Sequence, residues 1–175
     1  MKLIISKKLS DQIGGLKISL AFYKRGHKTV EAKLIEKLSK ENMEKQFRVY
    51  WKNEGKNKLN DFVRKINLDT IKLCLKEAEK ISKMKFKVNK FILVPTLTLG
   101  LSGYLDAKQN KIFFGFKSGD ITIVHEAVHT LFPSSTNESH LKVYQISEEA
   151  YRRVTGITID SPDKRFLLKD LGHSP

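Results

Sequence analysis

Two histidines and a glutamate stand close together in the second half of the chain. They form the run His125-Glu126-Ala127-Val128-His129. Residues four apart lie on one face of an α-helix, so both imidazoles can bind one Zn²⁺ ion if this run is helical. Glu126 is then placed to take a proton from a zinc-activated water. The pattern therefore predicts a zinc site with Glu126 as its general base.

The residues around this run are typical of a helix. Ser118-Gly119-Asp120 offers a helix N-cap, and Pro133 follows where the helix should end. Apolar residues at helical spacing form the buried side of the helix, namely Ile121, Val124, Val128 and Leu131. The alternative interpretation is an amphipathic helix whose two histidines are merely solvated.

A catalytic zinc normally takes three protein ligands and keeps one position for water, so a third ligand is needed. The candidates downstream of the motif are Glu138, His140, Glu148 and Glu149. Glu148 and Glu149 stand 19 and 20 residues after His129. This distance resembles the ligand spacing of the gluzincin metallopeptidases, which implies a glutamate as the third ligand.

The geometry of the next helix favours His140 instead. Ser135-Thr136-Asn137-Glu138 is a capping box, which predicts a helix from about residue 136 to Thr155, with Gly156 as its C-terminal stop. An antiparallel return after Pro133 places His140 opposite His129, whereas Glu149 lies about 13 Å farther along the helix. His140 falls on the inward face, with Val143, Ser147, Ala150, Tyr151 and Val154. We therefore favour His140, with Glu149 and then Glu148 as alternatives.

The charge of the chain is unevenly distributed. It has 33 Lys and Arg against 19 Asp and Glu, a formal net charge of +14. Residues 1–95 contain 24 basic and 10 acidic residues, and residues 96–175 contain nine of each. An excess of this kind indicates a surface for DNA or another polyanion. The alternative is a set of solvated lysines, because they form no long block.

We expect an α+β protein of two parts. Residues 1–85 form a mainly helical, strongly basic segment, in which residues 3–5 and 16–23 are strands around Gly14-Gly15 and residues 52–58 are a loop. Residues 86–175 form the catalytic core, with a small antiparallel or mixed sheet before the two ligand helices. Residues 111–116 are the expected edge strand, able to pair with an extended peptide.

No apolar run approaches the ~20 residues that a membrane-spanning helix needs. The apolar run Leu3-Ile4-Ile5 is too short for a signal peptide. Cys74 is the only cysteine, which excludes an internal disulfide bond and is compatible with a reducing compartment. These observations predict a cytoplasmic protein with no membrane partner.

Strands followed by an HExxH helix resemble the zincin metallopeptidases. The run His140-Leu141-Lys142-Val143-Tyr144, a histidine with an aromatic four residues later, resembles the SprT-like and Spartan-like metallopeptidases. Glu149-Ala150-Tyr151 resembles instead the third-ligand helix of the gluzincins, which are thermolysin-like and aminopeptidase-like enzymes, so a minimal thermolysin-like enzyme is the alternative. The first resemblance implies a zincin-like core and proteins bound to DNA as substrates, which would suit the basic half.

The predicted function is that of a zinc metalloendopeptidase, in which Glu126 activates the water that attacks the peptide carbonyl and then passes the proton to the leaving amine. Its partner is a protein or peptide substrate. The candidate donors to the oxyanion are Tyr104, Tyr144 and Tyr151. The alternative is a basic nucleic-acid-binding protein whose zinc is structural or absent.

Overall fold

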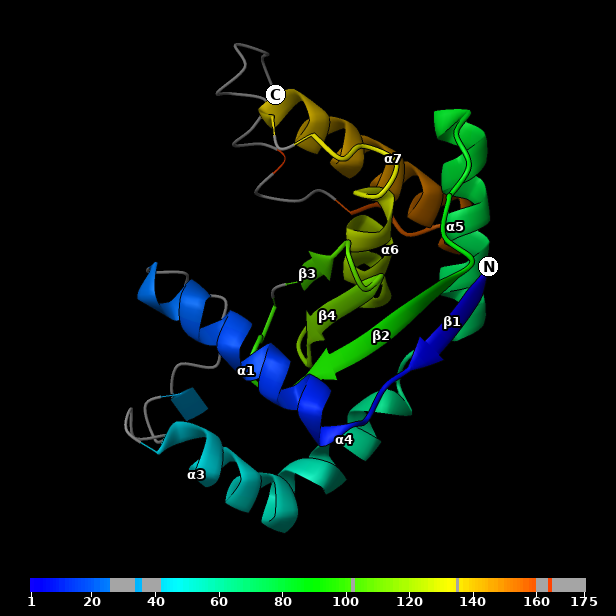
Figure 1. Ribbon diagram of the computed structural model, residues 1–175. Helices are drawn as coiled ribbons and strands as arrows, with labels where there is room; N and C mark the ends of the chain where they lie inside the picture. The colour runs from blue at the N-terminus through cyan, green and yellow to red at the C-terminus, as the bar shows by residue number, and fades with distance from the viewer. Residues whose placement is uncertain (26–33, 36–41, 102, 135, 160–163, 165–175) are drawn as a thin grey trace. The chain divides into compact units, whose positions relative to one another are not determined.

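The computed structural model describes residues 1–25, 34–35, 42–101, 103–134, 136–159 and 164 (Figure 1). They form an α+β fold that divides into two compact units. The sheet unit comprises Lys2–Ile66 and Lys90–Gly119, and the helical unit comprises Met1, Asn67–Asn89 and Asp120–Pro175. Both units take segments from either side of residue 85, so they do not coincide with the division expected there.

The sheet unit contains a four-stranded mixed sheet in the order β1-β2-β4-β3. β1 (Lys2–Ile5), β2 (Lys90–Thr96) and β4 (Lys111–Gly115) run parallel, and β3 (Gly103–Asp106) is antiparallel to β4. The prediction that residues 111–116 are an edge strand was therefore wrong. β4 hydrogen-bonds on both sides, because the glycine-containing segment before it returns as β3 and covers its outer side.

The strand predicted at residues 3–5 is confirmed as part of β1, whereas helix α1 (Leu9–Lys24) corrects the prediction of a turn at Gly14-Gly15 and a strand at residues 16–23. The two glycines lie inside the helix and allow it to approach the sheet closely. A Cβ atom on Gly15 would lie 2.4 Å from the Thr96 methyl group of β2, which no real Cβ contact tolerates. The glycine pair thus serves helix–strand packing, although in sequence it has the appearance of a turn.

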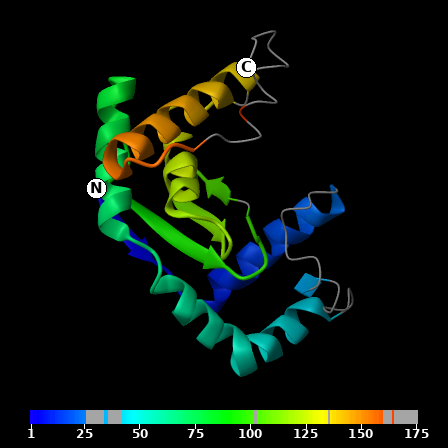
Figure 2. The same cartoon turned by 180° about the vertical axis from the view of Figure 1, so that it is seen from behind.

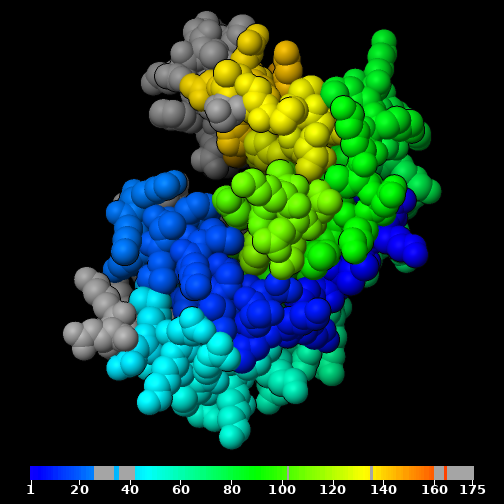
Figure 3. All heavy atoms as spheres, viewed as in Figure 1, coloured from blue at the N-terminus to red at the C-terminus, as the bar shows by residue number. Residues whose placement is uncertain are grey.

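The second correction concerns residues 52–58, which are helical and not a loop. α3 (Met43–Tyr50) continues through the π-helical turn η1 (Trp51–Gly55) into α4 (Lys56–Val63). Trp51, Gly55 and Leu59, four residues apart, are buried along one side, while the polar residues between them face solvent. Phe47 of α3 packs on Ile13 and Leu16 of α1, and Figure 3 shows the atoms of α1 and α3 in contact.

The helical unit consists of α5 (Leu68–Ser82), α6 (Asp120–Val128) and α7 (Asn137–Thr155). α5 and α7 lie side by side in both ribbon views (Figures 1 and 2). The apolar core of the helical unit includes Ile71 and Leu75 of α5, Val124 and Val128 of α6, and Val143 of α7.

The ends of α7 lie where the sequence predicts them. The Thr136 hydroxyl accepts a hydrogen bond from the Ser139 N–H at 3.2 Å, so Thr136 is the N-cap. Gly156 ends the helix with φ of 73°, in the left-handed region that glycine adopts without strain. These two signals fix which residues of α7 lie opposite the end of α6. Within the described part of the chain, no helix combines the length and apolar character needed to cross a membrane.

Candidate metal centre

His125 and Glu126 lie on α6, and His129 lies one residue after its last residue, Val128. The His129 N–H donates to the His125 carbonyl at 3.2 Å, so the helical spacing continues through the second histidine. The centroids of the two imidazole rings are 4.9 Å apart. The motif therefore forms a helix that presents both histidines on one side, as the sequence predicts.

α7 brings His140 to these two rings. The Nε2 atoms of His125 and His140 are 3.3 Å apart, and the ring centroids of His129 and His140 are 4.8 Å apart. One ligand nitrogen from each of the three histidines lies within 4.8 Å of the others. The three rings lie together because the connection between α6 and α7 is short and places the first turn of α7 opposite the end of α6.

The three nitrogens suit a zinc ion. Tetrahedral zinc with Zn–N distances of about 2.0–2.1 Å separates two nitrogen ligands by about 3.3–3.4 Å. The His125–His140 pair already has this separation, at 3.3 Å. All pairs lie within 4.8 Å, so the widest pair would have to close by at most about 1.5 Å, which rotation of the rings can supply. Three imidazoles are also a donor set that zinc commonly takes.

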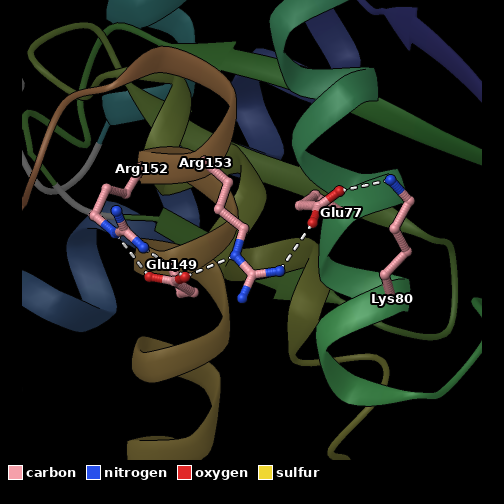
Figure 4. Close-up of polar contacts among 5 residues, drawn as sticks. All are labelled: Glu77, Lys80, Glu149, Arg152 and Arg153. Carbon is pink, nitrogen blue, oxygen red and sulfur yellow. Dashed lines mark hydrogen bonds and ion pairs between the residues drawn. The ribbon is translucent and has the colours of Figure 1, made fainter.

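The three glutamates considered as third ligands lie elsewhere. Glu138 is exposed, and Glu148 is buried with its carboxylate accepting a hydrogen bond from Lys164 at 2.6 Å. Glu149 accepts from Arg152 and Arg153, each at 2.7 Å, and Figure 4 shows its carboxylate between these two side chains. These hydrogen bonds lower the pKa of Glu149 to about 2. None of the three carboxylates belongs to the histidine cluster.

Arg153 also explains why Glu149 points away from the histidines. Its guanidinium donates to Glu149 and, at 3.1 Å, to Glu77 of α5 (Figure 4). Lys80 completes this surface chain of charges by pairing with Glu77 at 2.8 Å. Glu149 therefore belongs to an ion-pair network that connects α7 with α5.

Burial sets the protonation of the histidines and of Glu126. It lowers the pKa of His125 to about 3 and that of His129 to about 4, and the charge of the neighbouring imidazoles acts in the same direction. Both rings are therefore neutral at pH 7, which is the form that binds a metal. Burial also raises the pKa of Glu126 to about 8, a value suited to a group that both accepts and returns a proton near neutral pH.

Of the three candidate tyrosines, Tyr144 contacts the histidines. Its ring centroid is 4.3 Å from that of His125, and it stacks on His140 at 5.0 Å and 25°. Tyr151 instead has Asp120 and Cys74 as neighbours, and burial together with their charges raises its pKa. Tyr104 lies on β3 of the sheet unit.

Ser147 is the residue whose role sequence reasoning missed. It was placed on the inward face of α7 without any chemical role. Its Oγ lies 3.5 Å from Nδ1 of His125. The only sequence signal is its position seven residues, or two helical turns, after His140 on the same face.

No protein-family model, curated protein or solved structure matches the chain.

Proposed function

We propose that the chain is a zinc-dependent metalloendopeptidase in which His125, His129 and His140 hold the metal and Glu126 is the general base. The observation that supports this function best is the cluster of three imidazole nitrogens within 4.8 Å of one another, with a carboxylate next along α6. Three neutral ligands leave one tetrahedral position open, as a catalytic zinc requires.

Zinc bound at this site would polarise a peptide carbonyl and lower the pKa of a water molecule. Glu126 would take a proton from that water as the water attacks the carbonyl, and would later deliver the proton to the amine of the departing peptide. Burial raises the pKa of Glu126 to about 8, so this carboxyl can change its protonation state near neutral pH. Tyr144, whose ring contacts two of the three histidines, is the favoured donor to the carbonyl oxygen.

The charge of the two units favours substrates that are associated with nucleic acid. The sheet unit contains 21 Lys and Arg against 8 Asp and Glu, whereas the helical unit contains 12 against 11. A unit with a net charge of +13 attracts polyanions, and the attraction falls as salt concentration rises. The same charge would serve the alternative function, a nucleic-acid-binding protein whose zinc is structural or absent.

Glu126→Gln separates these two functions. Zinc-loaded wild-type protein should cleave casein or a quenched fluorescent peptide library, and the variant should lose about 10²- to 10⁴-fold in rate while retaining zinc. Glu138→Gln is the matched control, since Glu138 is an exposed glutamate outside the histidine cluster, and it should keep full activity. Zinc-loaded wild-type protein without peptidase activity would contradict the proposed function.

A further inference from the structure

The buried hydroxyl of Ser147 lies near the ring nitrogen of His125 that does not face His140. His125 directs Nε2 toward His140 at 3.3 Å, and its other ring nitrogen, Nδ1, lies 3.5 Å from Ser147 Oγ. Ser147 is fully buried in α7, so its hydroxyl must find partners within the protein. The two ring nitrogens of His125 thus contact two different residues of α7, His140 and Ser147.

The direction of the hydrogen bond between Ser147 and His125 follows from the other contacts of the hydroxyl. Ser147 Oγ lies 2.7 Å from the Val143 carbonyl oxygen and 3.1 Å from the Tyr144 carbonyl oxygen. A carbonyl can only accept, so the single hydroxyl proton of Ser147 is used for the shorter of these contacts. The Ser147 oxygen can then only accept from His125, and Nδ1 must carry the proton.

We infer that Ser147 is a positioning residue for the metal centre: it holds His125 in the tautomer protonated at Nδ1 and leaves Nε2 free to bind a divalent cation. This inference rests on the proposed function, since it concerns how one of the three ligands is prepared. At 3.5 Å the contact is at the upper limit of hydrogen-bond distance, and a small rotation of the ring shortens it. Histidines that bind metals generally donate their second N–H in this way.

The tautomer can be measured without any substitution. In metal-free wild-type protein at about pH 8, imidazoles with ordinary pKa values are neutral, and two-bond ¹⁵N–¹H correlation spectra distinguish protonation at Nδ1 from protonation at Nε2. His125 should be protonated mainly at Nδ1. A His125 protonated mainly at Nε2 would overturn the inference, whatever the metal affinity of the protein.

Ser147→Ala tests the effect on metal binding. The variant should bind Zn²⁺ about 10- to 100-fold more weakly in competition with a chromogenic chelator, and its His125 should shift toward the other tautomer. Thr155→Val is the matched control. The Thr155 hydroxyl likewise donates to the carbonyl oxygen four residues earlier on α7, that of Tyr151, at 2.8 Å, but Thr155 lies outside the histidine cluster. Thr155→Val should bind zinc as the wild type does.

The outcomes separate this inference from the proposed function. Wild-type protein that binds no zinc would overturn both. Zinc binding by the wild type and an equal affinity in Ser147→Ala would overturn the role of Ser147 alone. Circular dichroism of Ser147→Ala should show intact helices, as expected for a serine-to-alanine change within a helix.

Discussion

One carboxylate of the sheet unit and one of the helical unit respond differently to burial. In the sheet unit, the Asp11 carboxylate accepts hydrogen bonds from Ser6 and Lys111, and Ser19 bonds to Thr98 at 2.8 Å. In the helical unit, burial shifts the pKa of Glu126 upward to about 8. Paired polar groups stabilise a fold, whereas groups whose pKa is shifted by burial are typical of sites that do chemistry.

The clustering of histidines in the helical unit sharpens this contrast. His125, His129 and His140 are partly buried beside one another, although each would repel the others if protonated. A core selected for stability alone has no need of three imidazoles in contact. A divalent cation would convert this arrangement from a cost into a source of stability, because it binds the folded form.

The largest expected effects come from matched substitutions in the two cores. Leu59 of α4 and Leu75 of α5 are both fully buried, one in each unit. Leu59→Ala and Leu75→Ala should each lower the free energy of unfolding by about 3 kcal/mol, through lost burial and the cavity left behind. Hydrogen exchange should accelerate most in the unit that carries the substitution. Equal acceleration throughout the chain would remove the distinction between the units.

A smaller effect should depend on pH and belong to the sheet unit. Burial alone would raise the pKa of Asp11, but hydrogen bonds from Lys111 and Ser6, with the charges of Lys111 and Lys8, outweigh it and lower the pKa. Such a carboxyl stabilises the fold above its unfolded pKa of about 3.9, and this contribution is lost as the pH falls through the folded pKa.

Asp11→Asn should therefore cost about 2 kcal/mol at neutral pH, and the difference from wild type should narrow below about pH 4. Urea denaturation at a series of pH values measures this difference. Asp61→Asn is the control, because Asp61 forms an exposed pair with Arg64 and should change stability little. If the difference in unfolding free energy between wild type and Asp11→Asn stays constant below about pH 4, the charge of Asp11 contributes nothing to stability.

The smallest effect should come from Glu149, which the spacing of the sequence had made a ligand candidate. Its ion pairs with Arg152 and Arg153 are at the surface, where water and salt screen them. Glu149→Gln should leave zinc affinity unchanged and lower the thermal midpoint only slightly, with even that difference disappearing at about 1 M NaCl. A marked loss of zinc affinity in Glu149→Gln would indicate that Glu149 is a metal ligand.

The sequence predicted the helical unit better than the sheet unit, for local reasons. The HExxH helix, the start of α7 near residue 136 and the stop at Gly156 are signals read within a few residues. Once the ends of α7 are known, the helical period is enough to predict that His140 lies on the inward face and that Glu149 pairs with Arg153.

The sheet unit depends on contacts between distant residues. β1 pairs with β2, which lies more than eighty residues later, and nothing near β1 indicates this parallel pairing. Gly15 suggests a turn until Thr96 is known to be its neighbour. β4 was misassigned to the edge for a similar reason, because its position depends on where β3 returns. Ser147 had no predicted role because a hydrogen-bond direction is visible only in three dimensions.

The most direct test of the account is the zinc stoichiometry of purified protein, measured by elemental analysis and by titration of the metal-free form. The wild type should bind one Zn²⁺ per chain, and His140→Ala should weaken binding by more than about 100-fold, since a ligand contributes at least as much as the groups that orient it. Wild-type protein that contains no stoichiometric metal and binds none on addition, or a His140→Ala variant with undiminished affinity, would contradict the account.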